Sequence, residues 1–293
     1  MRILISVDME GISGVTRWQD VIPQGQDYQR ARSWMTGDVN AAVSGARAGG
    51  ATEFVVEENH GVEMLCNLVL DEIDPAVDVV RGLPRNGPTT IAALEAAANG
   101  EVAPFDALFL VGHHAKAGDR PGIGAHTISY ESYKAVRVDG RAVSEGEIFA
   151  IAAAQQALPT ALIAGDDVVA AELTRVVPGI ETAVVKRALS RTGGWIIPPV
   201  RAQGIIHAAA QRATERVAAG SIPVIDVDPP FSVEVELRAP LAPEPRAAIE
   251  RDHPEYEIDG DRTLCFRHEE MSVAYRMMTV CGVLAEKGRI PRG

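Results

Sequence analysis

Short apolar segments rich in β-branched residues alternate with longer alanine-rich segments through the first two-thirds of the chain. The longer segments predict helices, among them residues 31–48 and 90–98. The short segments predict β-strands at residues 3–7, 54–57, 77–80, 107–111 and 162–164. Strands that are apolar throughout and are separated by helices are typical of a parallel sheet with helices on both faces. Ligands of such sheets bind beyond the carboxyl ends of the strands, so functional side chains are expected there.

The pattern changes in the last third of the chain. Pro198-Pro199 interrupts the alternation, and a helical stretch follows at residues 202–219. Residues 232–237 then alternate apolar and charged positions, which indicates a half-exposed antiparallel strand, and residues 262–267 have the pattern of its partner. A final amphipathic helix is expected at residues 271–284.

The 293 residues suffice for one large domain or two modest ones, at about 100–200 residues per domain. We expect an α/β fold, a mostly parallel sheet with helices on both faces, followed by a smaller C-terminal α+β domain. The change of pattern predicts domains at residues 1–190 and 191–293.

The composition excludes several classes of protein. Asp and Glu number 40 and Lys and Arg number 28, so the formal net charge is −12. A surface this acidic repels phosphate backbones and anionic membranes, which argues against nucleic-acid and membrane partners. No apolar run approaches the ~20 residues of a membrane span, and no signal-peptide core follows Arg2. Three widely spaced cysteines fit a reducing compartment, so a cytoplasmic location is expected.

Two carboxylates and a histidine follow the first two predicted strands. The first strand leads into Asp8 and Glu10, and the second ends in Glu57-Glu58-Asn59-His60. Buried carboxylates need a positive partner, which a metal ion supplies well. Capping of a helix or turn would also explain the acids, and a lone His is more often a hydrogen-bonded polar residue than a ligand. Their shared position at one sheet edge is what favours a metal site.

The strand at residues 107–111 leads into Gly112-His113-His114, which brings two more imidazoles to the same edge. Imidazole and carboxylate ligands without thiolates suit Zn²⁺, Mn²⁺ or Fe²⁺ better than Mg²⁺. Adjacent residues point in different directions, so one of the two histidines is expected to bind directly, with His113 packed behind. His126 follows in a glycine-rich loop, where an imidazole suits proton transfer, although an exposed loop histidine is the simpler explanation.

Two later groups of acids mix structural and functional roles. Ser144 and Glu147 have capping-box spacing at the start of a helix, so Glu147 is expected to cap the Ser144 backbone. Glu145 has no such role and could face a cation. Asp167 is explained by a helix N-cap as well as by a functional role. Three further candidates for the same sheet edge are Lys186, Ser190 and Arg191.

The segment Ser6-Val7-Asp8-Met9-Glu10-Gly11-Ile12-Ser13-Gly14 resembles the opening of the D-aminopeptidases of the peptidase M55 family, the DppA-like zinc enzymes. This chain has Glu58-Asn59 where the family more often has Asp-Ser or Asp-Ala, which changes a contact beside the first metal histidine. The similarity covers most of the first two-thirds in the same order, through Asn59-His60 and residues 108–115, 121–126, 143–145, 164–167 and 184–191.

The resemblance implies a site for two zinc ions, with Mn²⁺ or another divalent metal as an alternative. By the resemblance, residues 1–190 are the metal-binding catalytic domain and His126 is the catalytic histidine. The implied activity is that of an aminopeptidase, which hydrolyses the N-terminal residue, a D-amino acid, from a short peptide or amino-acid amide. The resemblance further implies a homo-oligomer, with a ring-shaped decamer as the form known in the family. The implied metal ligands are Asp8, Glu10, His60, His114 and Glu145.

Two other classes of protein remain as alternatives. A Mg²⁺-dependent phosphohydrolase of the haloacid-dehalogenase type also has Asp after its first strand, and a later Gly-Asp-Asp can hold Mg²⁺. That chemistry has no use for His60, His114 and His126. A non-catalytic metal- or ligand-binding protein would account for a pocket, but it leaves five ligand-type residues without a purpose.

Overall fold

The larger of two sheets is mostly parallel. The structure is a computed structural model that describes residues 1–61, 65–82, 91–118 and 121–288. Within these residues the spatial strand order is β3-β2-β1-β4-β7-β8-β9, and β9 alone runs antiparallel to its neighbour. The expected α/β class is therefore confirmed. The strands are β1 (Arg2–Val7), β2 (Glu53–Glu58), β3 (Val77–Val80), β4 (Ala107–Val111), β7 (Thr160–Asp166), β8 (Glu181–Ser190) and β9 (Gly193–Ile196).

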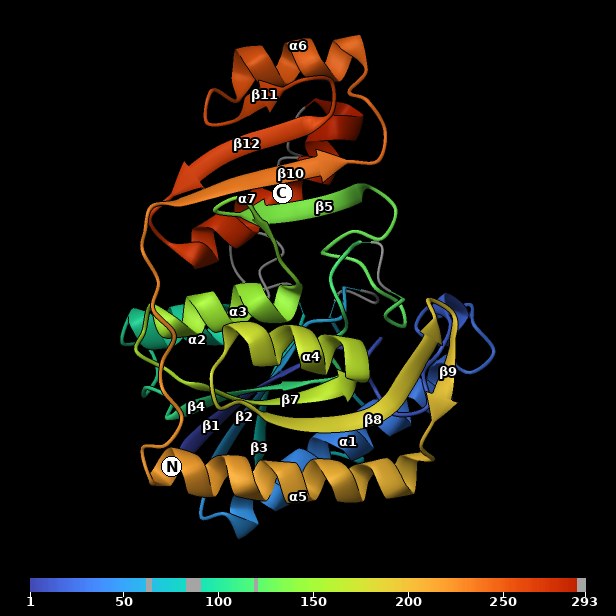
Figure 1. Ribbon diagram of the computed structural model, residues 1–293, viewed down its shortest axis with the longest axis vertical. Coiled ribbons are helices and arrows are strands. Elements are labelled where there is room, and N and C mark those ends of the chain that lie inside the picture. Colours follow the sequence, from blue (N-terminus) through green and yellow to red (C-terminus); the bar gives the residue numbers. More distant parts are fainter. Residues whose placement is uncertain (62–64, 83–90, 119–120, 289–293) are drawn as a thin grey trace.

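Helices cover both faces of this sheet (Figure 1). On one face α1 (Tyr28–Ala48) and α5 (Pro199–Ala218) pack against each other. They approach so closely that a Cβ on Gly45 would lie 2.1 Å from the carbonyl oxygen of His207, so this crossing requires glycine. The central strands are buried on both sides, which explains their continuous apolar sequence. The other face carries α2 (Ala92–Ala98), α3 (Glu145–Ala154) and α4 (Asp167–Val176).

The second sheet is antiparallel and stands above α3 in Figure 1. Its order is β11-β12-β10-β5-β6. The C-terminal helix α7 packs on this sheet and reaches α3, where the Tyr275 ring meets the edge of Phe149. One hydrophobic core therefore continues from α3 and α4 through α7 into the second sheet. The elements are β5 (Tyr133–Val138), β6 (Arg141–Ala142), β10 (Phe231–Leu237), α6 (Pro243–Asp252), β11 (Glu257–Asp259), β12 (Thr263–His268) and α7 (Met271–Lys287).

The two sheets do not divide the chain at residue 190. β5 and β6 precede that residue but belong to the second sheet, where β5 pairs with β10 and β6 pairs with β5. β9 and α5 follow it but belong to the larger sheet and its covering layer. The sequence pattern misses this exchange because strand pairing over long separations leaves no periodic signal. The organisation into domains 1–190 and 191–293 stays a prediction.

Most predicted elements are present with bounds that differ by a few residues. The predicted pairing of residues 232–237 with residues 262–267 is confirmed by the β10–β12 ladder. The Asp139-Gly140 turn joins β5 and β6 with positive φ at both residues, as a two-residue hairpin turn requires. Thr90, the first residue of one predicted helix, lies outside the described residues. No helix in the described part of the chain is long and apolar enough to cross a membrane.

Candidate metal centre

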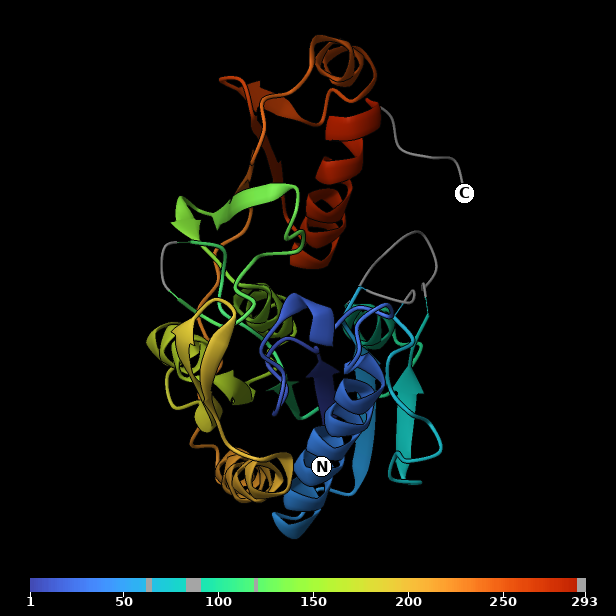
Figure 2. The same ribbon diagram turned by 90° about the vertical axis from the view of Figure 1, so that its right-hand side faces the viewer.

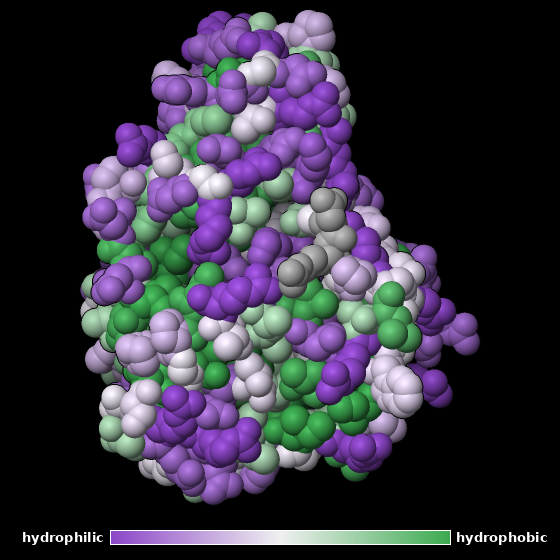
Figure 3. Space-filling view, viewed as in Figure 1, coloured by the Kyte–Doolittle hydropathy of each residue, from purple (hydrophilic) through white to green (hydrophobic). Residues whose placement is uncertain are grey.

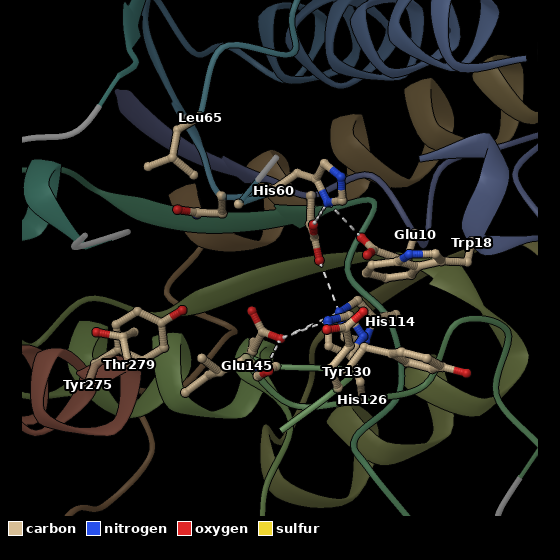
Figure 4. Close-up of a pocket in the computed structure, with 16 residues that line it drawn as sticks. Glu10, Trp18, His60, Leu65, His114, His126, Tyr130, Glu145, Tyr275 and Thr279 are labelled. Carbon is tan, nitrogen blue, oxygen red and sulfur yellow. Dashed lines mark hydrogen bonds and ion pairs between the residues drawn. The ribbon is translucent and has the colours of Figure 1, made fainter. Parts of the chain in front are cut away.

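The carboxyl ends of β1, β2 and β4 lead into a cavity of about 400 Å³ that α7 closes on one side. Figure 4 shows that the labelled acids and imidazoles point toward one another inside it. The structure thus brings together the five implied metal ligands and the implied catalytic histidine, each no more than 6% exposed. They are Asp8, Glu10, His60, His114, His126 and Glu145.

The loop that carries the first two acids is fixed by the neighbouring strand end. The Asp8 amide donates to the carbonyl oxygen of Val111 at 2.9 Å, and the Gly11 amide donates to that of Gly112 at 2.7 Å. A Cβ on Gly11 would lie 2.0 Å from the carbonyl oxygen of His113, so only glycine fits where the two loops cross. The motif glycine therefore sets the depth of the acids in the pocket.

Asp8 lies between two histidines and offers one oxygen to each. Its Oδ1 is 3.5 Å from Nδ1 of His60, which is also 3.0 Å from Oε2 of Glu10. Its Oδ2 is 3.2 Å from Nε2 of His114, which is also 3.5 Å from Oε1 of Glu145. Two groups with metal-ligand spacing result, Asp8–Glu10–His60 and Asp8–His114–Glu145, and they share Asp8.

The histidine tautomers present lone pairs to these acids. Nε2 of His60 is 2.8 Å from the carbonyl oxygen of Val21, and Nδ1 of His114 is 3.0 Å from that of Ala115. A carbonyl oxygen only accepts, so these nitrogens carry the hydrogens and the opposite nitrogens face the acids. Hydrogen bonds of this kind orient metal-binding histidines.

Two acid oxygens that are buried in the cavity, Oδ2 of Asp8 and Oε2 of Glu10, have no hydrogen-bond partner among the described residues. Unpaired buried carboxylate oxygens that face imidazole lone pairs require a cation between them. The donors are carboxylates and neutral imidazoles, which suit Zn²⁺ and similar divalent ions. The residues present therefore fit a metal centre.

The pKa shifts in the cavity have the same origin. Burial alone would lower the pKa of His60, but Glu10 and Asp8 raise it well above its ordinary value. Burial would likewise lower the pKa of His114, which Asp8 and Glu145 raise well above the ordinary value. Burial would raise the pKa of Asp8, but the contacts with His114 and His60 hold it well below the usual range. The cavity attracts cations, and protons and metal ions compete for the same positions.

Glu145 owes its position to the start of α3. The Ser144 hydroxyl oxygen accepts from the Glu147 amide at 3.2 Å, which confirms the predicted N-cap. Glu145 is therefore the first residue of the helix, where its Oε1 accepts from the Ile128 amide at 2.7 Å and faces His114. The side chain holds its position through one backbone bond and leaves its remaining lone pairs to the cavity.

The predicted role of the Glu147 side chain is wrong in one respect. Its carboxylate does not reach back to the Ser144 amide; it binds Arg141 at 2.5 Å and lies 3.9 Å from the Lys116 ammonium. Two cations outcompete a backbone N–H for a carboxylate. Glu147 is buried and structural as expected, but through ion pairs.

His126 enters the cavity on the loop that follows β4. Its ring stacks on that of His114, with centroids 4.1 Å apart and planes 9° apart. Nδ1 lies 2.8 Å from the carbonyl oxygen of Gly124, so Nδ1 carries the hydrogen. Nε2 therefore carries a lone pair, and it lies 3.9 Å from Oε1 of Glu145. Glu10, His114 and His126 also have metal-ligand spacing. The geometry allows His126 to accept a proton or to bind a metal.

Lys186 fixes the loop that follows β1 and carries Asp8 and Glu10. Its ammonium is fully buried and donates to the carbonyl oxygens of Glu10 at 2.6 Å, Ile12 at 2.9 Å and Val15 at 2.7 Å. All three N–H bonds are used. Burial lowers the pKa of Lys186 to about 8, although acids nearby oppose the shift. A lysine within a mostly apolar strand is the sequence signal that indicates a buried ammonium bound to backbone carbonyl oxygens.

The remaining candidates surround the cavity without entering it. His113 is buried behind it, as expected, with Nε2 2.8 Å from the Ser6 hydroxyl oxygen, which also accepts from Asn59. Arg191 donates to the carbonyl oxygen of Ala125 beside His126. The Ser190 hydroxyl oxygen only accepts from a turn amide.

The N-cap of α4 is one residue earlier than predicted. Asp166 accepts from the amides of Val168 and Val169, whereas Asp167 accepts from the amide of Ala188 in β8. Both acids are therefore structural in this structure. Three further histidines lie outside the cavity lining: His207, His253 and His268.

Part of the cavity wall was not predicted. These residues come from a short 3-10 helix (Trp18–Asp20), from loops and from α7, where no motif or periodicity distinguishes a lining position from a core position. Trp18 and Tyr130 stack on each other beside His126, with ring centroids 5.0 Å apart. The other wall residues not predicted include Leu65, Ile128, Ser129, Glu131, Tyr275 and Thr279.

Comparison with known proteins agrees with this geometry. The family model Peptidase_M55, described as D-aminopeptidase, matches residues 1–280. The D-aminopeptidase of Bacillus subtilis (strain 168) is 28% identical over 299 residues, which cover 97% of this chain and 98% of that protein. A solved structure described as the Zn-dependent D-aminopeptidase DppA from Bacillus subtilis, a self-compartmentalizing protease, matches with a TM-score of 0.84 and 24% identity. It covers 99% of this chain and 100% of the other, and it shares the fold.

Proposed function

Since the chain belongs to the Peptidase_M55 family of D-aminopeptidases, we propose that it is a zinc-dependent aminopeptidase that releases an N-terminal D-amino acid from a short peptide or amino-acid amide. The phosphohydrolase and the non-catalytic binding protein are not favoured. The family match spans nearly the whole chain, and neither alternative accounts for three imidazoles beside three carboxylates.

The position of Asp8 carries the proposal. Because its two oxygens face two separate histidine–carboxylate pairs, we assign Asp8 as a ligand shared by two metal ions. Glu10 and His60 would complete one site, and His114 and Glu145 the other. Three carboxylates offset three of the four positive charges of two Zn²⁺ ions, so the centre could still attract a hydroxide or a substrate oxygen. When bound, the two ions would polarise the scissile carbonyl and lower the pKa of the attacking water.

His126 is assigned to proton transfer. Its Nε2 lone pair faces the cavity and can take a proton from the attacking water as the C–O bond forms. The same nitrogen can then return that proton to the nitrogen of the leaving group as the C–N bond breaks. Water is thereby divided between the two products, and no external acid or base is needed.

Substrate size and assembly follow from the cavity and from the family. A volume of about 400 Å³ suits a short peptide rather than a folded chain. The related solved structure is described as self-compartmentalizing, which supports a homo-oligomer here. The ring-shaped decamer and the cytoplasmic location stay predictions.

The test of this function is metal content measured together with activity on matched D- and L-aminoacyl p-nitroanilides and dipeptides. We expect about two zinc ions per chain and preference for the D-series. Mg²⁺-dependent hydrolysis of phosphate esters without peptidase activity would support the phosphohydrolase instead. Metal without any hydrolysis would support the binding protein.

His126→Ala separates proton transfer from metal binding. The variant should keep both zinc ions and the wild-type melting temperature and should lose about 10²–10⁴ in kcat. His207→Ala, a histidine outside the cavity, is the control and should retain full activity. Loss of zinc from His126→Ala would make His126 a ligand, and unchanged kcat would remove it from the mechanism.

A further inference from the structure

The β8–β9 hairpin and the residue that follows the start of α5 carry the most exposed large apolar side chains in the described part of the chain. Leu189 is 73% exposed, Trp195 72% and Val200 83%. The next most exposed, Leu70, reaches 47%. Tryptophan is among the residues most enriched at the centres of protein interfaces, and grouped apolar residues on a surface mark interaction sites.

These side chains belong to one hairpin and to the start of the helix that follows it. Trp195 of β9 lies directly opposite Arg187 of β8. Leu189 is two residues beyond Arg187, where the β8–β9 pairing is irregular, and its side chain is exposed to solvent as well. Val200 follows at the start of α5. Figure 3 shows hydrophobic residues in this lower right region of the molecule, over the hairpin and the adjoining end of α5.

The hairpin cannot relieve this exposure by folding inward, because it is attached to the loop that carries His126. The Gly124 amide donates to the carbonyl oxygen of Arg191 at 3.0 Å, and the Arg191 guanidinium donates to that of Ala125. A Cβ on Gly194 would lie 2.6 Å from the Ile123 side chain, so the contact is close. The apolar face is therefore held rigidly toward solvent.

Charges identify what could cover it. Arg187 and Arg201 flank the apolar face, and neither makes an ion pair with any described residue. The opposite edge of the same sheet is β3, which carries the exposed Asp78, and the segment that leads into β3 carries the exposed Leu70 and Asp71. Figure 2 shows the two edges on opposite sides of the larger sheet, the hairpin in gold and β3 in cyan. One edge is apolar and basic, and the other is apolar and acidic.

We propose that the outer face of the β8–β9 hairpin, formed by Leu189, Trp195 and Val200, binds the β3 edge of a second copy of this chain. Opposite charges attract at this contact although whole copies, at a net charge of −12 each, repel. A contact between two different surfaces is heterologous, and it builds a closed ring when its rotation closes. The inference rests on the assembly in the proposed function and specifies the surfaces that make it.

Molar mass by light scattering, over a range of protein concentrations, tests the contact. Wild type should run as a multiple of 31.2 kDa, Trp195→Glu should fall toward 31.2 kDa, and Trp195→Phe should retain the large mass. Val102→Glu, at a site 38% exposed in the segment that leads into the central strand β4, is the control and should not change the mass. Thermal unfolding of each variant establishes that it folds, and Val200→Glu provides a second disruption. A wild-type monomer, or full assembly of both Glu variants, overturns the proposal.

A charge exchange tests the pairing of the two edges. Arg187→Glu with Arg201→Glu should dissociate the assembly, and adding Asp71→Lys with Asp78→Lys should restore the mass. Dissociation that the second pair does not repair overturns the assignment of β3 as the receiving edge. Mass is measured without substrate, so failure of the peptidase assignment would leave this result unaffected.

Discussion

At the scale of single residues, the cavity depends on which of two neighbouring glutamates faces it. Glu145 and Glu147 are both buried in the first turn of α3. The Glu145 carboxylate faces His114 and receives one backbone hydrogen bond, whereas Glu147 faces Arg141 and Lys116 on the other side of the helix. Two residues along a helix correspond to a rotation of about 200°, so the pair cannot share a role.

Substitution by glutamine should separate the two roles. Glu145→Gln keeps an oxygen for the Ile128 amide but loses the charge that would hold a metal, so bound zinc should fall from about two ions per chain to about one. Glu147→Gln should keep both ions and lose about 1–3 kcal/mol of unfolding free energy, because Arg141 and Lys116 lose their partner. Elemental analysis and thermal melts measure both effects, and equal zinc loss in the two variants would contradict the assignment.

The same residues explain how much of the site the sequence could reveal. Asp8, Glu10, His60 and His114 follow strand ends, so the rule for parallel sheets predicts from the sequence alone that they lie together. His126 lies in a loop whose path no periodicity encodes, and only the resemblance to a family identified it. Trp18 and Tyr130 left no sequence signal because aromatic residues outside long helices and strands more often pack locally.

At the scale of elements, apolar strands and amphipathic helices were predictable because burial imposes a period on the sequence. β8 was missed because its second half leaves the core: Val185 is buried, but Arg187, Leu189 and Ser190 are exposed. The pairing of β5 with β10 joins residues nearly one hundred positions apart, which one sequence cannot reveal. Asp166 rather than Asp167 caps α4 because β7 extends two residues beyond its apolar run.

The junction of β2 and α2 should make stability depend on pH. Glu57 of β2 is buried and accepts hydrogen bonds from the amides of Ala92 and Ala93. Burial raises the pKa of Glu57 to about 7 from an ordinary value of 4.5. The folded state then holds a proton that the unfolded state releases between these values, so this residue's contribution to stability falls as the pH rises from about 4.5 to 7.

Glu57→Gln should remove that dependence. Relative to wild type, the variant should gain up to about 3 kcal/mol of unfolding free energy between about pH 4.5 and pH 8, since one pKa unit corresponds to about 1.4 kcal/mol. Denaturant unfolding at several pH values measures the difference. Glu53→Gln, an exposed acid on the same strand, is the control and should track wild type. A wild-type-minus-variant difference that does not change with pH would refute the assignment.

At the scale of the whole molecule, the metal centre lies where the larger sheet, α3 and α7 meet. Its candidate ligands come from the loops after β1, β2 and β4 and from the first turn of α3. The opposite wall carries Tyr275 and Thr279 of α7, which also packs on the second sheet. Metal ions at this position would tie together three strand ends and a helix from nearly half of the chain, so their free energy of binding should appear as stability of the entire fold.

Removal of zinc with a chelator should therefore lower the melting temperature of the whole protein. At free zinc about 100-fold above its Kd, each site contributes about 2.7 kcal/mol.

In the metal-free protein, the acids around His60 and His114 raise the pKa of both imidazoles above 6.5. The contribution of these protonated histidines to the unfolding free energy is complete below about pH 6.5, and it is lost as the pH rises through their raised pKa values. Protons thus replace zinc at low pH and not at high pH, so the melting-temperature gap between zinc-loaded and metal-free protein should widen from about pH 6 to pH 9. Calorimetry with and without chelator measures this gap, and a gap that stays constant or narrows would show that the two histidines do not face the metal positions.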